Sequence, residues 1–123
     1  KDVEGVGSFV AVDGGMGDNI RPALYGAEYD AVLAKDPNAP IAQNASIVGK
    51  FCESGDILIK DYDFPKTEPG DVIAMLSTGA YGYVMASNYN RNPRPAIVFV
   101  EDGKARLVVK RESYEDMIRN EIL

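Results

Sequence analysis

Short apolar segments, each bounded by Gly, Pro, Asp or Asn, recur along most of the chain. Runs of this length are typical of β-strands rather than of long helices. The segments that the pattern predicts as strands are 8–12, 28–33, 45–50, 57–59 and 72–76. The first and the last of them are expected to be mostly buried, because they hold almost no polar residue.

Turn signals separate these strands. Glu68-Pro69-Gly70-Asp71 predicts a tight turn, whereas the acidic segment 61–65 is expected to be irregular. Further along, apolar runs at 96–100 and 105–109 flank Asp102-Gly103, a pair that favours the tight turn of a β-hairpin.

Only short helices are expected. Asp18 and Asn19 are suitable caps for a helical turn over 20–25, which Gly26 would end. A charged helix is predicted over 112–122, with Ser113 as its N-cap. Six or seven short strands with so little helix predict a mainly β fold, a Greek-key barrel or sandwich.

Composition narrows the class of protein. The chain has 123 residues and a formal net charge of −6, which indicates one domain and argues against binding to nucleic acid. No apolar run approaches the roughly 18 residues that a membrane span needs. With one cysteine and no histidine, a zinc site lacks its usual ligands, and a reducing cytoplasm is the expected location.

The single cysteine lies in the most reactive combination of residues that the sequence offers. Cys52 is followed by Glu53 in a Gly/Ser/Asp turn between two apolar runs. A thiol beside a carboxylate on a tight loop can donate a proton or bind a cationic ligand. The alternative is that Cys52 is a small buried hydrophobe beside an ordinary turn acid.

A second polar combination lies near the start of the chain. Arg21 and Tyr25 are four residues apart on the predicted helical turn, so they share one face and could bind a carboxylate, or could be a surface arginine packed on a tyrosine. The preceding glycine-rich loop, 13–18, allows close approach to a ligand but does not have the spacing of a dinucleotide-binding loop.

Three long motifs identify a resemblance. Residues 12–27 read VDGGMGDNIRPALYGA, residues 48–56 read VGKFCESGD, and residues 79–90 read GAYGYVMASNYN with RPA following at 94–96. In sequence and in order, these segments closely resemble signatures of the diaminopimelate decarboxylases. The resemblance covers essentially the whole chain.

The resemblance implies a fold and a domain organisation. That family has a pyridoxal-phosphate-binding barrel followed by a β domain of the alanine-racemase type. Residues 1–123 look like the C-terminal β domain alone, without the barrel that carries the Schiff-base lysine and most of the binding site for pyridoxal 5'-phosphate. We therefore expect this chain to be inactive by itself, and an unpaired sheet edge to favour self-association.

The resemblance also implies a reaction and residue roles. Meso-diaminopimelate loses carbon dioxide with the help of pyridoxal 5'-phosphate, and protonation then gives L-lysine. Cys52 matches the proton donor, and Glu53 matches the residue that holds the distal ammonium. Arg21 and Tyr25 match groups that bind the distal carboxylate, and Tyr81 matches a contact to cofactor and substrate. In the family the active site lies at the interface of a homodimer.

Other residues in the motifs have less definite roles. Tyr83, Tyr89 and Asn90 either take part in the site or only support its loops, whereas Asp13 and Asp56 are expected to fix turns. Two alternative functions stay open: the β domain of an ornithine- or arginine-type decarboxylase, and a stand-alone module used for binding or assembly. Glu53 and the Arg21/Tyr25 pair favour a substrate with a second carboxylate, which ornithine lacks.

Overall fold

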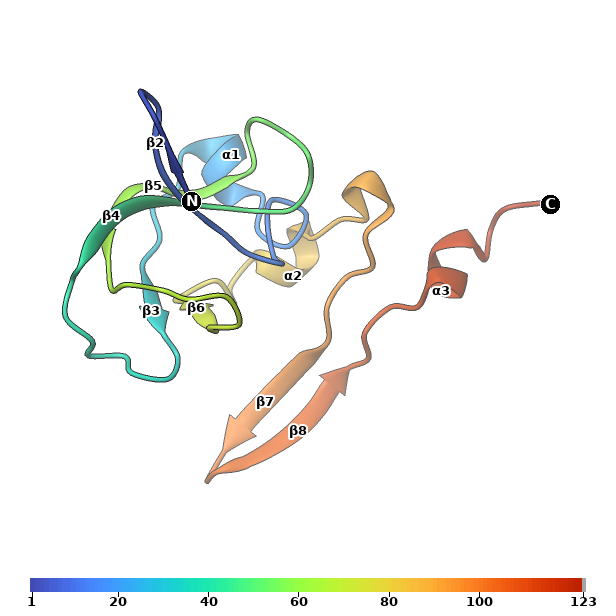
Figure 1. The fold of residues 1–123 in the computed structure, drawn as a ribbon. Coiled ribbons are helices and arrows are strands. Elements are labelled where there is room, and N and C mark those ends of the chain that lie inside the picture. The colour runs from blue at the N-terminus through green and yellow to red at the C-terminus, as the bar shows by residue number, and fades with distance from the viewer. Residues whose placement is uncertain (123) are drawn as a thin grey trace.

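The largest sheet of the computed structural model, which describes residues 1–122, has four strands (Figure 1). The strand order is β1-β2-β4-β5. Its members are β1 (Asp2–Val3), β2 (Gly7–Ala11), β4 (Gln43–Val48) and β5 (Ile57–Phe64). Strands β2 and β4 run parallel, with Val10 opposite Ile47, while the other neighbours are antiparallel.

Two smaller sheets complete the strands. β3 (Ala31–Leu33) pairs antiparallel with β6 (Ile73–Met75). β7 (Ile97–Glu101) and β8 (Lys104–Val109) form the predicted hairpin. Asp102 and Gly103 at its tip have φ values of 51° and 69°, the left-handed backbone that this type of turn requires.

The helices are short. They are α1 (Arg21–Tyr25), α2 (Gly82–Met85), the 3-10 turn η1 (Tyr89–Arg91) and α3 (Tyr114–Ile118). Gly26 ends α1 in the left-handed conformation, as predicted. The N-cap position is occupied by Ile20 rather than by the predicted Asp18 or Asn19, although Asn19 Oδ1 accepts from the backbone N–H of Arg21 at 3.4 Å. At α3 the prediction of the cap is confirmed, because Ser113 and Asp116 form a reciprocal capping box.

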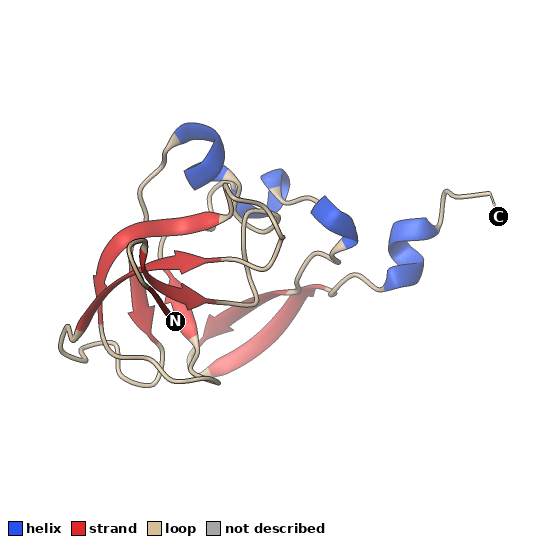
Figure 2. Cartoon of the chain, turned by 45° about the horizontal axis from the view of Figure 1, so that its top comes forward, coloured by secondary structure: helices blue, strands red, loops and turns tan. Residues whose placement is uncertain are grey.

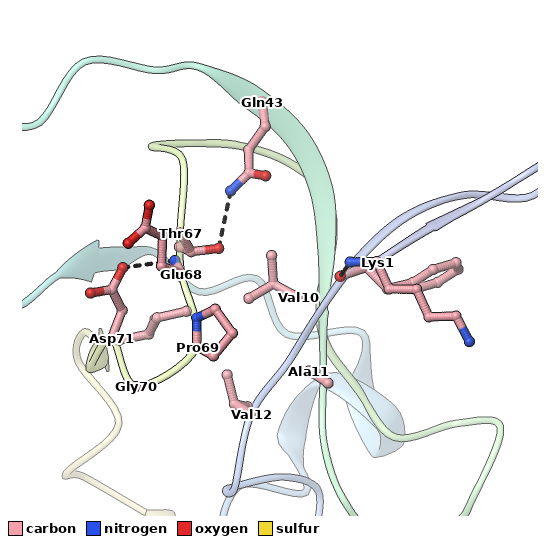
Figure 3. Close-up of a pocket in the computed structure, with 12 residues that line it drawn as sticks. Lys1, Val10, Ala11, Val12, Gln43, Thr67, Glu68, Pro69, Gly70 and Asp71 are labelled. Carbon is pink, nitrogen blue, oxygen red and sulfur yellow. Dashed lines mark hydrogen bonds between the residues drawn. The ribbon is translucent and has the colours of Figure 1, made fainter.

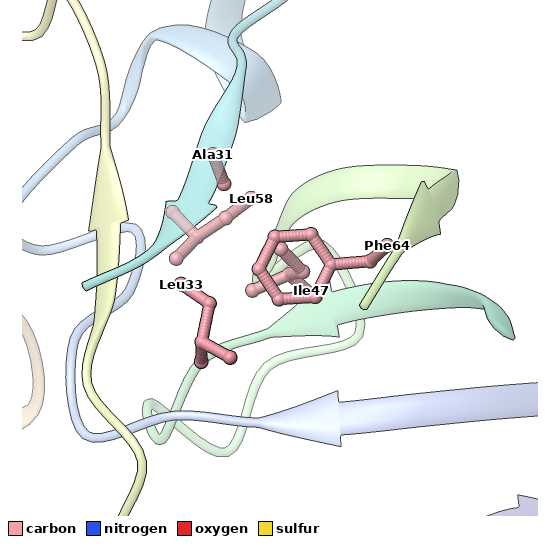
Figure 4. Close-up of a cluster of buried hydrophobic side chains, with 5 residues drawn as sticks. All are labelled: Ala31, Leu33, Ile47, Leu58 and Phe64. Carbon is pink, nitrogen blue, oxygen red and sulfur yellow. The ribbon is translucent and has the colours of Figure 1, made fainter. Parts of the chain in front are cut away.

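The hydrophobic core lies between the four-stranded sheet and the β3–β6 pair. Ile47 and Phe64 are almost fully buried, and Leu33 and Leu58 pack against them (Figure 4). These residues come from β3, β4 and β5, which lie close together although they are separated in the sequence. We refer to residues 1–76, which include this core, as the body.

The C-terminal part of the chain extends away from the body. Figure 1 shows the β7–β8 hairpin projecting outward, and both overall views show α3 and the C-terminus far from the core (Figures 1 and 2). No residue between 83 and 122 is buried in the structure. We refer to residues 96–122 as the arm.

The structure confirms a mainly β fold with short helices, but the described strands form three separate sheets and no closed barrel. The irregular structure predicted over 61–65 is wrong, because β5 continues to Phe64. There the acidic residues alternate with Tyr62 and Phe64, whose rings pack at 5.8 Å between centroids against the core. This alternation is that of a strand with one buried face.

Several predicted elements are shorter or more exposed than the sequence indicated. Strand β3 covers only the last three residues of 28–33, and α3 covers only part of 112–122. The strand predicted over 72–76 is not mostly buried: Val72 is 65% exposed, and β6 itself is half-buried. Strand β2 is likewise half-buried. Both strands lie at the rim of the small core rather than across it.

Candidate functional site

The glycine-rich loop at 13–18 is filled by the chain's own side chains. A Cβ atom at Gly15 would lie 2.7 Å from the carboxylate of Asp56 and 2.6 Å from the ring of Phe51. The Asp56 carboxylate, which is buried, accepts hydrogen bonds from the backbone N–H of Met16 at 2.6 Å and of Phe51 at 2.8 Å. The glycines therefore allow Phe51 and Asp56 to approach the loop closely, which holds it against the Cys52 loop. The prediction that Asp56 fixes a turn is confirmed.

The carboxylate that closes the glycine-rich loop itself is Asp18, not Asp13. Asp18 accepts from the backbone N–H of Gly15 at 3.0 Å, and burial raises the pKa of its carboxyl. Asp13 is exposed, and no hydrogen bond of its side chain is found among residues 1–122.

The turn between β4 and β5 presents Cys52 to solvent. Its side chain is exposed and free, so the alternative of a buried structural thiol is wrong. Cys52 has a φ of 54°, a left-handed conformation that is uncommon for residues other than glycine. The neighbouring Phe51 is fully buried and anchors the turn, which leaves the thiol directed outward from a fixed backbone.

Glu53 is held in place by hydrogen bonds to both of its carboxylate oxygens. Oε1 accepts from Ser54 Oγ at 3.2 Å and from the backbone N–H of Gly55 at 3.5 Å, and Oε2 accepts from Tyr89 Oη at 3.1 Å. The bonds from Gly55, Tyr89 and Ser54, in this order of size, lower the pKa of the Glu53 carboxyl. Glu53 is therefore an exposed, charged acceptor suited to an ammonium group.

The second cluster surrounds Arg21. Its guanidinium carbon lies 5.4 Å from the ring centroid of Tyr25 and 5.0 Å from that of Tyr81. The predicted shared face of Arg21 and Tyr25 is confirmed, and the structure adds Tyr81 from a segment far along the chain. Cation–π contacts orient a guanidinium without neutralising its charge. None of the ion pairs among residues 1–122 involves Arg21.

The structure thus gathers the five predicted residues into two clusters. Arg21, Tyr25 and Tyr81 form one, and Cys52 and Glu53 form the other. Among the described residues, no hydrogen bond, ion pair or ring contact joins the two directly. Both clusters lie at the surface: Tyr25 is 63% exposed and Tyr81 57%.

The residues with open roles divide between the clusters and their surroundings. Tyr89 and Asn90 both bond to the Cys52–Glu53 loop. Tyr89 Oη donates to Glu53, and Asn90 Nδ2 donates to the backbone carbonyl of Phe51 at 2.6 Å. Tyr83 instead lies under the guanidinium of Arg94, which is 5.5 Å from its ring centroid. Arg94 in turn pairs with Glu112, a residue that the sequence analysis missed since no motif includes it.

Two hollows lie on the surface of the body. One of about 290 Å³ lies between β2 and the turn at 67–71 (Figure 3). The other, of about 500 Å³, lies between α1 and β5. Neither of these two hollows is lined by any of the five predicted site residues.

The cluster residues fit only part of a cofactor site. A phosphate needs free backbone N–H groups or cations. In the glycine-rich loop the N–H groups of Gly15 and Met16 already donate to Asp18 and Asp56, whose charges would repel a phosphate. This loop therefore does not fit a phosphate, whereas the exposed ring of Tyr81 can contact a cofactor presented from outside.

Within residues 1–122 no group of three or more Cys, Asp or Glu side chains is placed to hold a metal ion. In the same part of the chain, none of the helices has the length and apolarity to cross a membrane.

Comparisons with a family model and with individual proteins point to the same family. Residues 1–79 match the family described as pyridoxal-dependent decarboxylase, C-terminal sheet domain. The diaminopimelate decarboxylase of Bacillus subtilis (strain 168) is 60% identical over 119 residues, which are 97% of this chain and 27% of that protein. That of Bacillus methanolicus is 62% identical over 112 residues, 91% of this chain and 26% of that protein.

Solved structures agree. A crystal structure of diaminopimelate decarboxylase from M. jannaschii in complex with L-lysine superposes with a TM-score of 0.86 at 37% identity. The match covers 94% of this chain and 26% of that one. The chain therefore spans about a quarter of the length of the relatives it matches.

Proposed function

Because the chain belongs to the family of the C-terminal sheet domain of pyridoxal-dependent decarboxylases, we propose that residues 1–123 are this domain of a diaminopimelate decarboxylase. The whole enzyme converts meso-2,6-diaminopimelate to L-lysine and carbon dioxide. Its pyridoxal-phosphate-binding barrel lies outside this sequence. The identities of 60% and 62% to two diaminopimelate decarboxylases support the proposal.

One observation carries the choice of substrate. The surface holds a guanidinium at Arg21 without an ion-pair partner among residues 1–122, and a charged carboxylate at Glu53. The end of diaminopimelate that does not react bears both a carboxylate and an ammonium. Arg21 with Tyr25 binds the first, and Glu53 binds the second by a charge-assisted hydrogen bond. Ornithine has no second carboxylate, so Arg21 would have no substrate group to bind.

Cys52 is the proposed proton donor. The cofactor, when bound, supplies the electron sink that allows carbon dioxide to leave. The Sγ atom of Cys52 then gives its proton to the carbon that has lost the carboxyl group. Its exposed position on a turn anchored by Phe51 suits a group that acts on a substrate held by another surface. Tyr81 contacts the cofactor and the substrate from the Arg21 cluster.

The division into two clusters supports an active site at the interface of a homodimer. Cys52 and Glu53 of one subunit complete the centre whose cofactor is held by the other. We further propose that the separate sheets are parts of a Greek-key barrel of the alanine-racemase type in the whole enzyme, and that the enzyme works in the cytoplasm. Sedimentation of the intact enzyme tests the homodimer, a crystal structure of the intact enzyme tests the barrel, and cell fractionation tests the location.

The decisive experiment compares substrates on the intact protein that contains this chain. Steady-state assays of carbon dioxide release should show a much larger kcat/KM for meso-diaminopimelate than for ornithine. Cys52→Ala should lower kcat by about 10²- to 10⁴-fold, the usual contribution of a general acid. A larger kcat/KM for ornithine, or no carbon dioxide release from either substrate, would overturn the proposal.

The separate chain provides a second test. Residues 1–123 with added pyridoxal 5'-phosphate should release no carbon dioxide, because the barrel lysine that holds the cofactor is not among them. Release at a rate above that of free cofactor would contradict the proposed division of labour.

A further inference from the structure

A strained segment between α2 and β7 supports the Cys52–Glu53 loop from outside. Tyr89 Oη donates to Glu53 Oε2 at 3.1 Å across 36 positions of sequence. Asn90 Nδ2 donates to the Phe51 carbonyl at 2.6 Å, and the rings of Phe51 and Tyr89 lie 6.1 Å apart. Two hydrogen bonds and a ring contact therefore join this segment to the loop.

The backbone of this segment is unusual. Asn90 and Arg91 have φ values of 51° and 58°, so two successive residues other than glycine are left-handed. Such conformations persist only where surrounding contacts impose them, and they occur preferentially at functional sites. Here the contacts include Asn92 Nδ2 donating to the Tyr89 carbonyl at 3.2 Å.

Glu112, from the arm, fixes the segment at both ends. Its Oε2 accepts from Asn88 Nδ2 at 2.6 Å and from the backbone N–H of Arg94 at 2.8 Å. Its Oε1 accepts from the guanidinium of Arg94 at 2.9 and 2.6 Å. One carboxylate thus holds the residues that flank Tyr89 and Asn90 on either side.

These contacts fix the orientation of the Glu53 carboxylate. Ser54 and Gly55 hold one carboxylate oxygen, and without Tyr89 the other would be free to rotate about the terminal bond. With all three donors in place, the plane of the carboxylate is fixed, and Oε2, which accepts only from Tyr89, keeps a lone pair for a further donor. A pre-oriented acceptor binds an ammonium with a smaller entropy loss.

Resting on the proposed function, we propose that Tyr89 is a positioning residue that orients the Glu53 carboxylate toward the distal ammonium of the substrate. Asn90 and Glu112 hold Tyr89 in place, and Tyr89 itself touches no reacting atom. This role adds to the proposed binding role of Glu53 and explains why the strained backbone at Asn90 and Arg91 is kept.

Tyr89→Phe in the intact protein tests this role, because it keeps the ring against Phe51 and removes only the hydroxyl. We expect KM for meso-diaminopimelate to rise about three- to tenfold, the worth of one hydrogen bond, with kcat within about twofold. Tyr114→Phe, at an exposed tyrosine of the arm, is the matched control and should leave both constants unchanged.

A titration separates positioning from general support of the fold. Since the Tyr89 bond lowers the pKa of Glu53, Tyr89→Phe should raise this pKa toward its ordinary value, while the Gly55 and Ser54 bonds keep it somewhat lower. Carbon-13 NMR of labelled glutamate in the intact protein, with Glu53→Gln for assignment, measures the change. The acid limb of kcat/KM should move to higher pH in the same variant.

The outcomes are distinguishable. Failure of the wild-type protein to decarboxylate meso-diaminopimelate would overturn the proposed function, and with it the substrate part of this inference. An active wild type with an unchanged KM, or an unchanged pKa of Glu53, in Tyr89→Phe would overturn the inference alone.

Discussion

The body and the arm are built from similar short strands, yet their apolar side chains have different surroundings. In the body, Ile47 and Phe64 are fully enclosed between two sheets. In the arm, Val98, Val100 and Leu107 lie on one face of the hairpin and are 47%, 73% and 57% exposed. An apolar face of this kind is stabilising only when another surface covers it.

The difference shows that the body provides the stability of the folded chain, whereas the arm supports the candidate site. The body has the buried residues that oppose the entropy of chain ordering, whereas the arm contributes through polar contacts such as Glu112 with Arg94. The candidate site lies between them, with Cys52 on a turn of the body and Tyr89 on the segment that Glu112 of the arm holds.

The sharpest test of this contrast is truncation of one phenylalanine in each region. Phe64→Ala should lower the free energy of unfolding by about 3–5 kcal/mol, because the ring is buried and its removal leaves a cavity. Phe99→Ala, at a ring that is 55% exposed, should cost less than about 1 kcal/mol. Urea unfolding of residues 1–123 measures both, and equal losses would contradict the division into body and arm.

The glycine-rich loop extends the comparison to the edge of the site. Gly15→Ala should destabilise the chain by about 1–3 kcal/mol, since the added Cβ would overlap Phe51 and the Asp56 carboxylate. Gly79→Ala, outside the body, meets no atom within 4 Å and should have little effect. The same urea titrations provide the measurement, and a neutral Gly15→Ala would mean that the loop can shift away from Phe51.

The sequence predicted the parts of the fold that depend on local signals. The Asp102-Gly103 hairpin, the end of α1 at Gly26 and the Ser113 cap were all predicted, because each needs only neighbouring residues. Strand burial was not predicted well for β2 and β6, since burial depends on which sheets pack together. The strand over 61–64 was missed because its acidic residues hid the alternation with Tyr62 and Phe64.

For the candidate site, the motifs supplied the residues but not their grouping. Helical spacing was sufficient to place Arg21 beside Tyr25, but Tyr81 joins them from 56 positions beyond Tyr25 through tertiary structure. The exposure of Cys52 could not be read from the sequence, where a thiol between apolar runs is as suitable for a core. Glu112 gave no signal at all, because its importance lies in four contacts made across the fold.

The Arg94–Glu112 ion pair should make a smaller and pH-dependent contribution to stability. The bonds from Arg94, and then from Asn88, lower the pKa of Glu112 to about 2. The Glu112 carboxyl thus binds a proton less tightly in the folded chain than in the unfolded chain, where its pKa is the ordinary value near 4.5. The stabilisation is therefore complete above about pH 5.5 and is lost as the pH falls toward 2.

Glu112→Gln removes that charge while keeping the size of the side chain. At pH 7 it should cost about 1 kcal/mol, the upper range for a partly exposed ion pair. The difference from wild type should shrink to near zero by pH 2, as followed by urea unfolding at several pH values. Glu101→Gln, at the exposed end of β7, is the control. A difference that stays constant with pH would show that Glu112 acts by packing rather than by charge.

The smallest effect on folding is expected on the apolar face of the hairpin, where the consequence is for association instead. Leu107→Lys should change the free energy of unfolding by less than about 0.5 kcal/mol, because the side chain is already 57% exposed. The free edges and apolar face of β7 and β8 favour pairing between copies of residues 1–123, and a lysine there opposes it. Sedimentation at high concentration should therefore detect oligomers of the wild-type chain and fewer of Leu107→Lys. Leu24→Lys, the same change at an equally exposed leucine of α1, should leave association unchanged, and a monomeric wild type would contradict the prediction.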